Sequence, residues 1–403
     1  MTLTTSMCWK EISAEQYCDS VRDGTHDSPK FLDAGFPLIT SKNIKMGQII
    51  LDSANLISES DFKEINRRSK VDRWDVLFSM IGTVGEVCLV HDEEPAFAIK
   101  NIGLFKSGDE IKGKWLYYSL TNPITKAAIK QAHRGASQQY IPLGELRKLP
   151  IRVPTNQGVM HSVVSILSAY DDLIENNQRR MALLEESARL LYNEWFVRLR
   201  FPGHEHTPII DGVPKGWERK TLGDLCCKIR ETASPDTLEP DTPYIGLEHM
   251  PRRSISLNDW GKVEQVTSSK HRFRDGEILF GKIRPYFHKV GVAFVDGVAS
   301  SDAIVIRPVE EKLHGLVLMT VSSDGFVAVT SQTMKEGSKM PRADWKQMQA
   351  YSVPLPPSGL LSTFDGVIQP IIAQLKALTF ANQKLRAARD LLLPRLMCGD
   401  LAV

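Results

Sequence analysis

Two clusters of basic residues are the part of this 403-residue sequence whose side chains suggest a recognisable chemistry. In the second cluster, between residues 270 and 289, aromatic residues and histidines are interleaved with the cations. Such mixtures suit contact with the phosphates and base edges of a nucleic acid. A solvated charged face is the alternative interpretation, because single runs of charge usually mean that. The clusters consist of Lys63, Arg67, Arg68, Lys70 and Arg73, and of Lys270, Arg272, Arg274, Lys282, Arg284 and Lys289.

Four polar loops could supply side chains that read bases. Residues 40–43 and 137–140 in the first half have counterparts at 246–249 and 338–341 in the second, with different side chains at the tips. Asparagine and glutamine pair with adenine, whereas lysine and arginine pair with guanine. Two readers of different sequences would need different loops on a shared scaffold, although neutral drift of surface loops produces the same pattern.

A catalytic interpretation finds little support in the sequence. It contains no glycine-rich nucleotide-binding loop, no Gly-x-Ser-x-Gly elbow and no His-Glu-x-x-His motif. Asn122-Pro-Ile superficially resembles the Asn-Pro-Pro-aromatic motif of amino-methyltransferases, but its third and fourth positions differ, and we interpret it as a turn. His204 and His206 alternate in a linker without other ligands, so we predict no metal site there.

The elements that would position these loops occur twice. Segment 75–81 returns at 277–283, segment 36–44 returns at 242–250, and each basic cluster abuts the first of these segments. The offset drifts from 208 residues (Trp9 to Trp217) to 200 (Val153 to Val353), as small insertions and deletions would produce. Because solenoid units are only ~20–50 residues long, the pattern indicates a duplicated domain.

Short β-rich runs bounded by turn residues predict strands in both globular parts, and we expect a mixed α+β fold in each. Residues 1–154 are expected to be mostly strands and turns. The predicted strands are 75–80, 86–90, 97–102, 278–280, 290–295 and 303–306, and the predicted short helices are 115–119 and 124–132.

Each globular part is followed by a long helical pattern, in which apolar residues recur by threes and fours as in a helix seam. The first helix is predicted over 159–199, with Asn156 or Ser162 as its N-cap and the segment 201–204 as its break. The second begins near residue 357, and Pro370 should kink it or mark its first turn.

An asparagine interrupts each seam near its middle, Asn177 in the first helix and Asn382 in the second. The intervening domain would let the helices pack antiparallel. We predict that the two asparagines then lie close together and fix helix–helix register, a well-attested role of seam asparagines. The alternative is that one or both face solvent.

Composition restricts the class of protein. The hydrophobic fraction is 42%, the charged fraction 24% and the net charge +2, so any nucleic-acid contact must come from local patches. The six cysteines form no Cys-x-x-Cys pair, which predicts reduced thiols. The N-terminus lacks a signal-peptide pattern and no apolar run reaches ~18 residues, so we expect a cytoplasmic protein that does not cross a membrane.

At this point the sequence resembles, over essentially its full length, the DNA-specificity subunit of a type I restriction–modification system. Segments 23–29, 37–44, 75–85 and 138–150 are typical of the first target-recognition domain of that family, and 183–196 of its central helix. Gly216-Trp-Glu opens the second domain, Lys339-Met-Pro-Arg closes it, and 388–401 is typical of the distal helix.

The resemblance implies two tandem target-recognition domains, each reading one half of a bipartite, asymmetric double-stranded DNA site. The helices would form an antiparallel coiled coil that sets the spacer and docks two copies of the modification subunit, and a restriction subunit joins them. The chain would bind no cofactor and perform no chemistry. S-adenosylmethionine would serve adenine methylation in the modification subunit, and ATP and magnesium the restriction subunit of the prokaryotic host.

The resemblance also implies domain limits: first target-recognition domain 1–155, central helix 156–200, linker 201–214, second target-recognition domain 215–356 and distal helix 357–403. The competing hypothesis is a coiled-coil scaffold that joins two protein-binding domains without a DNA role. The candidate DNA-contacting residues are Thr40, Ser41, Lys42, Asn43, Ser137, Gln138, Gln139 and Tyr140 in the first domain, and Glu248, His249, Lys282, Arg284, Tyr286, His288, Ser338, Lys339 and Arg342 in the second. The loops 80–83 and 247–249 are expected to belong to the same surfaces.

Overall fold

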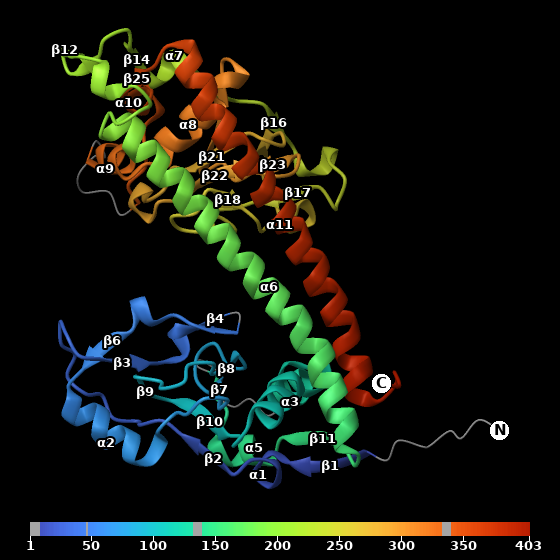
Figure 1. Cartoon of the computed structure of the whole chain (residues 1–403). Coiled ribbons are helices and arrows are strands. Elements are labelled where there is room, and N and C mark those ends of the chain that lie inside the picture. The colour runs from blue at the N-terminus through green and yellow to red at the C-terminus, as the bar shows by residue number, and fades with distance from the viewer. Residues whose placement is uncertain (1–8, 46, 132–138, 333–339) are drawn as a thin grey trace. The chain divides into compact units, whose positions relative to one another are not determined.

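The computed structural model describes residues 9–45, 47–131, 139–332 and 340–403. The chain divides into two compact units, Met1–Ile174 with Leu385–Val403 and Glu175–Lys384. The long helices α6 (Gln157–Tyr192) and α11 (Ser358–Cys398) contribute one part to each unit (Figure 1). Both units mix helices and sheets, as the α+β expectation required.

The first unit is built around a four-stranded antiparallel sheet of order β2-β10-β7-β8. In a second sheet, β6-β3-β9, strands β3 and β9 run parallel, and β1 pairs with β11 where the chain enters and leaves the domain. The strands are β1 (Trp9–Ser13), β2 (Ser20–Asp23), β3 (Phe36–Ile39), β4 (Ile44–Lys45), β5 (Gln48–Ile49), β6 (Asn55–Ile57), β7 (Val76–Ser79), β8 (Val87–Leu89), β9 (Ala98–Ile99), β10 (Ile102–Lys106) and β11 (Pro150–Pro154). The helices are α1 (Ala14–Tyr17), α2 (Glu59–Ser69), α3 (Glu110–Thr121), α4 (Pro123–Gln131) and α5 (Leu143–Lys148).

The second unit repeats this plan with two five-stranded sheets, β15-β24-β21-β22-β18 and β16-β20-β23-β17-β19. The order β15-β24-β21-β22 matches β2-β10-β7-β8, and the parallel pair β17-β23 matches β3-β9. The strands are β12 (Ile209–Ile210), β13 (Val213–Pro214), β14 (Glu218–Thr221), β15 (Cys226–Ile229), β16 (Thr232–Ala233), β17 (Pro243–Ile245), β18 (Ser256–Leu257), β19 (Gly261–Lys262), β20 (Lys270–Phe273), β21 (Ile278–Gly281), β22 (Val290–Ala293), β23 (Gly297–Ala299), β24 (Ala303–Pro308) and β25 (Ser352–Leu355). The helices are α7 (Leu222–Leu225), α8 (His314–Val321), α9 (Asp324–Gln332) and α10 (Trp345–Met348).

A buried acid explains why the repeated segment begins with Asp or Glu. Asp75 is 1% exposed, accepts a hydrogen bond from the backbone N–H three residues earlier at 2.7 Å, and pairs with Lys106 of β10 at 2.7 Å. Glu277 likewise accepts from the backbone N–H three residues earlier at 2.9 Å and pairs with Arg307 of β24. Each acid thus closes the turn before the central strand and neutralises a cation on its neighbour.

Helices cover the central sheets and complete the cores. In the first unit Phe78, Phe105 and Trp115 are fully buried together, and the Trp115 indole donates to the carbonyl of Arg152 at 3.1 Å. In the second unit Phe280 meets Phe326 edge-to-face at 5.9 Å. Burying each such side chain contributes roughly 1.5–3 kcal/mol relative to exposure.

The helices α6 and α11 pair antiparallel within each unit (Figure 1). In the second unit Asn177 lies opposite Asn382, and the ring of Trp195 lies 5.7 Å from that of Phe364. The steps from 177 to 195 and from 382 back to 364 are equal, which requires opposite chain directions. In the first unit Arg389 of α11 pairs with Asp171 of α6 at 2.5 Å.

The ends of these helices differ in part from the sequence-based expectation. Asn156 caps α6, since its side chain accepts from the N–H of Gly158 at 2.8 Å, whereas Ser162 lies inside the helix. The helix passes through a π turn (Asn193–Val197) and stops before residue 201, because Leu199 adopts a left-handed conformation with φ of 57°. Pro370 lies well past the first turn, because α11 starts at Ser358.

Two local predictions for the first domain were wrong. The run 97–102 is two strands, β9 and β10, because the chain reverses at Asn101 with φ of 54°. Residues 1–154 are less dominated by strands than expected, and α2 was missed entirely.

Among the described residues no single helix is long and apolar enough to cross a membrane. Two consecutive helices, Glu311–Val321 and Asp324–Gln332, reach that length together but bend by 64° at their junction.

Candidate nucleic-acid interface

In the first unit, two loops far apart in the sequence meet at the end of the central strand β7. Ile81 forms an isolated antiparallel bridge with Tyr140. The N–H of Ile141 donates to the carbonyl of Met80 at 3.0 Å, and the N–H of Gly82 donates to the carbonyl of Gln139 at 3.2 Å. The loops 80–83 and 139–140 therefore form one edge, held by main-chain bonds.

The second unit builds the same edge 202 residues later. Ile283 bridges Arg342, as Ile81 bridges Tyr140. The N–H of Ala343 donates to the carbonyl of Lys282 at 2.8 Å, and the N–H of Arg284 donates to that of Pro341 at 2.9 Å. The structure thus brings together loops that the sequence analysis paired only by analogy between the halves.

A third loop joins each edge from the parallel strand pair. In the first unit residues 40–43 leave β3, and the Ser41 hydroxyl lies 3.7 Å from where a Cβ on Gly82 would stand. In the second unit residues 246–249 leave β17, and the Lys289 ammonium donates to the carbonyl of Leu247. The described parts of three loops are therefore neighbours in each unit: 40–43, 80–83 and 139–140 in the first, and 246–249, 282–289 and 340–342 in the second.

Three of the predicted contact residues have structural roles in these loops instead. Asn43 is 4% exposed, and its amide binds Thr40, the carbonyl of Ile50 and Ser53. His288 is 7% exposed and donates from Nε2 to the carbonyl of Ser322 at 2.7 Å, and burial lowers its pKa. His249 Nδ1 accepts from the N–H of Gly246 at 3.0 Å and holds that turn. We assign all three to loop positioning, because Asn43 and His288 are buried and hydrogen-bonded and His249 Nδ1 closes its own turn.

The remaining candidates present side chains at the surface. Lys42, Gln139, Tyr140, Glu248, Tyr286 and Arg342 are exposed, and Thr40, Ser41, Lys282 and Arg284 are partly so. Contact of these residues with DNA stays a prediction. Ser137, Gln138, Ser338 and Lys339 lie outside the described residues.

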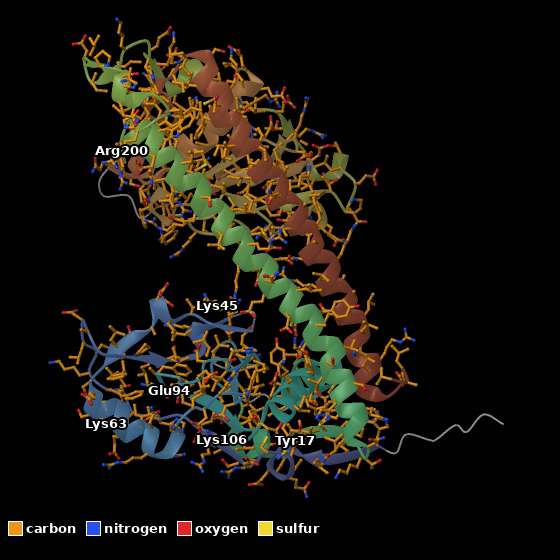
Figure 2. The ribbon with its side chains drawn as sticks, viewed as in Figure 1. Tyr17, Lys45, Lys63, Glu94, Lys106 and Arg200 are labelled. Carbon is orange, nitrogen blue, oxygen red and sulfur yellow. The ribbon has the colours of Figure 1, made fainter. Side chains whose placement is uncertain are left out.

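The first basic cluster does not provide free positive charge. Lys63, labelled in Figure 2, lies on α2 and pairs with Glu59 at 2.6 Å. The other four cations are paired as well: Arg67 with Glu64 at 2.6 Å, Arg68 with Asp23 at 2.5 Å, Lys70 with Asp72 at 3.0 Å and Arg73 with Glu93 at 2.5 Å. The solvated charged face, offered above as the alternative, describes this cluster.

The second basic cluster is divided in its roles. The Lys270 ammonium is buried and donates to the carbonyl and hydroxyl of Ser268 at 2.9 and 2.6 Å, so it serves the fold. Around Phe287, by contrast, Arg252 lies 4.1 Å and Arg284 5.9 Å from the ring centroid. The Phe287 ring is partly exposed and adjoins the exposed ring of Tyr286, and aromatic rings with guanidinium groups beside them suit contact with nucleotides. Sequence reasoning missed Arg252, whose position three residues after His249 was the available signal.

Each unit is also fastened to the helix pair by a carboxylate of α6. In the first unit Asp171 accepts from the Tyr118 hydroxyl at 2.7 Å and pairs with Arg389. In the second unit Glu185, 8% exposed, accepts from the hydroxyls of Ser254 and Ser256 at 2.7 and 2.5 Å.

The two seam asparagines lie together, because Asn177 Nδ2 donates to Asn382 Oδ1 at 2.9 Å. Their role in fixing helix–helix register stays a prediction.

A metal centre has no basis in the part of the chain that the structure describes, since no three His, Cys, Asp or Glu side chains gather there as ligands.

The chain is a tandem pair of α+β domains, each presenting a three-loop edge and each attached to paired helices. A family model for the type I restriction modification DNA specificity domain matches residues 9–186 and 214–385. The chain therefore belongs to this family.

Similar proteins agree with the family. The MjaIX type I restriction enzyme specificity subunit of Methanocaldococcus jannaschii is 21% identical over 388 residues, covering 91% of this chain and 87% of that protein. The EcoDI specificity subunit of Escherichia coli is 22% identical over 275 residues, covering 61% of this chain and 60% of its own length. A solved S subunit from M. genitalium shares the fold, with a TM-score of 0.58, 16% identity and 98% coverage of both chains.

Proposed function

We propose that this chain is the DNA-reading subunit of a type I restriction–modification complex. Each domain contacts one half of a bipartite, asymmetric double-stranded site, and the helix pair sets the unread spacer. The observation that supports this most directly is the repeated edge: the bridges Ile81–Tyr140 and Ile283–Arg342 preserve the backbone while the exposed side chains differ. Two domains that share a backbone scaffold but present different loop side chains can read two different half-sites.

The partners follow from the family. We propose that the helices dock two copies of the modification subunit, which holds S-adenosylmethionine and methylates adenine, and that a restriction subunit using ATP and magnesium joins them. The chain itself binds, positions and assembles without performing chemistry. Exposed leucines on the helices, Leu183 and Leu190 of α6 in the second unit and Leu173 of α6 and Leu391 of α11 in the first, are available for contact with a protein partner.

The decisive experiment sequences adenine methylation in the host with and without this gene. Loss of one gapped, asymmetric motif on deletion is the expected result, and it supplies both half-sites. An unchanged methylome, with the modification subunit expressed, would overturn the proposal and favour the scaffold that joins two protein-binding domains.

Substitutions at equivalent places of the repeat test the assignment of one half-site to each domain. Tyr140→Ala should relax or abolish reading of one half of the motif, and Arg342→Gln should affect only the other half. Lys312→Gln, an exposed lysine paired with Glu310 away from both edges, is the matched control and should leave the motif unchanged. A change in both halves from either substitution would contradict the division of labour.

A further inference from the structure

An open pocket of about 480 Å³ lies beside the three-loop edge of the second unit. Five cations line it: Lys228, Arg230, Lys282, Arg342 and Lys346. Lys282 and Arg342 belong to the bridged loops, and Lys346 lies on α10. Lys228 lies on β15, and Arg230 follows it two positions later, so both cations stand on one side of the strand.

The acids around the pocket do not balance these charges. Asp302 lies 3.6 Å from the Lys282 ammonium and 3.4 Å from the Arg342 guanidinium. Asp344 caps α10 by accepting from the backbone N–H of Lys346 at 3.0 Å. Among the described residues, two carboxylates therefore face five cations.

Burial and neighbouring cations both disfavour the protonated forms of two basic groups here. Burial lowers the pKa of Lys228, and the neighbouring Arg230 and Lys282 lower it further. The pKa of His271 is lowered by burial and by Lys228 and Lys282. In the part of the chain that the structure describes, the Nδ1 atom of His271 is buried without a hydrogen-bond partner. A bound anion would offset this repulsion.

The first unit provides an internal control, because the repeat identifies the equivalent position of each cation. The bridges align Arg342 with Tyr140 and Lys282 with Met80, and the strand registers align β15 with β2. None of the equivalent residues is basic, and two are buried in the core. They are Val21 for Lys228, Asp23 for Arg230, Met80 for Lys282, Tyr140 for Arg342 and Gly144 for Lys346.

We infer that this pocket binds a backbone phosphate of the DNA, so that the second domain holds the duplex by a charge contact that the first domain lacks. The inference rests on the proposed function and deepens it. Clustered ammonium and guanidinium groups in a concave surface recognise phosphate regardless of sequence, and such contacts set the register of a protein on the duplex. Lys228 and Arg230 supply this contact from outside the loop tips, and base reading is left to the tips, Arg342 among them.

The test compares salt dependence in the full chain assembled with its modification subunits. The variant Lys228→Gln/Arg230→Gln removes two cations that lie outside the loop tips. Binding to a short duplex carrying the methylated motif, and to a scrambled duplex, is measured by fluorescence anisotropy across salt concentrations. Lys262→Gln/Lys312→Gln is the matched control, because it removes the same charge from exposed lysines that pair with Asp241 and Glu310.

We expect the slope of log K against log salt to become shallower by about 0.9 for each phosphate that the variant no longer neutralises. Affinity should fall by a similar factor for both duplexes, and the control should retain the wild-type slope. An unchanged slope with intact motif binding overturns the phosphate site while leaving the proposed function standing. Weaker binding confined to the motif duplex assigns the pocket to base reading, and release of the modification subunit from the complex assigns it to protein binding; either overturns the inference. Absence of salt-dependent DNA binding by the wild-type complex overturns the proposed function as well.

Discussion

Replacing the paired seam asparagines with leucine, singly and together, tests how the helix pair is specified. Asn382 is 4% exposed and its Oδ1 accepts from Asn177 Nδ2 at 2.9 Å, whereas Asn177 is partly exposed. Asn177→Leu leaves the buried Asn382 amide without its hydrogen-bond partner, which costs about 1–3 kcal/mol of stability. Asn382→Leu leaves an amide that water can reach and adds buried apolar surface, so it should cost less than about 1 kcal/mol.

The double variant removes both amides and places two leucines in the seam. Because no polar group is then stranded, its stability should equal or exceed that of the wild type. The coupling energy of the cycle should therefore exceed about 1 kcal/mol in magnitude. The ranking of the two single variants by stability cost follows from burial alone. It therefore checks, independently of the coupling energy, which asparagine is the buried one.

Hydrogen exchange of peptides spanning 174–181 and 378–386, read by mass spectrometry, measures the local opening free energy without assuming that the whole chain unfolds in one step. Exchange in β3 (Phe36–Ile39), whose buried side chains share no core cluster with α6 or α11, is the internal control and should not change. Coupling below about 0.5 kcal/mol, the usual error of additivity, would refute a direct interaction between the two asparagines. A larger cost for Asn382→Leu than for Asn177→Leu would refute the burial argument.

Three further predictions concern the attachment of the domains to the helices and the thiols. Glu185→Leu should destabilise the second unit by about 3 kcal/mol, since two serine hydroxyls lose a charged acceptor in a buried site, and thermal melting monitored by circular dichroism measures this. Asp171→Asn should cost only about 0.5–1 kcal/mol in the same assay, because its ion pair with Arg389 is partly solvated; a cost as large as that of Glu185→Leu would contradict this ranking. Iodoacetamide at neutral pH should modify exposed Cys227 well before Cys226, because burial raises the pKa of the Cys226 thiol to about 12, and equal labelling of the two in peptide mapping would contradict the structure.

The sequence patterns predicted those parts of the fold whose residues are periodic. The repeated run at 75–81 and 277–283 contains a fully buried strand in both units, Val76–Ser79 and Ile278–Gly281, and apolar runs bounded by turn residues mark such strands. The seams around Asn177 and Asn382 are long enough for their three-and-four spacing to be unambiguous. The helix α2 lacks that signal, because its sequence is mostly polar and only Phe62 and Ile65 reach toward the core.

The candidate site was predicted less well, because its chemistry depends on partners distant in the sequence. Arg68 looked like a free cation until the fold brought it to Asp23, and Arg73 pairs with Glu93 twenty residues away. Asn43 looked like a reader of adenine, but its amide closes a turn onto Ile50 and Ser53. Lys228 drew no attention, because its cluster assembles from three separate segments of the second unit.

The edges that present the loops are held by backbone atoms, and this has a consequence for how their side chains can change. The bonds from Ile141 to Met80 and from Ala343 to Lys282 use only N–H and carbonyl groups, so methionine and lysine occupy the same place without loss of the bridge. The exposed tips, Tyr140 and Arg342, take part in the bridges through their main chains. Exchanging these tips between the domains should therefore cost less than about 0.5 kcal/mol of stability, the usual range for surface substitutions. A scaffold with this property separates stability from recognition, because new side chains at the tips leave the Asp75–Lys106 and Glu277–Arg307 pairs, at the opposite ends of the central strands, unchanged.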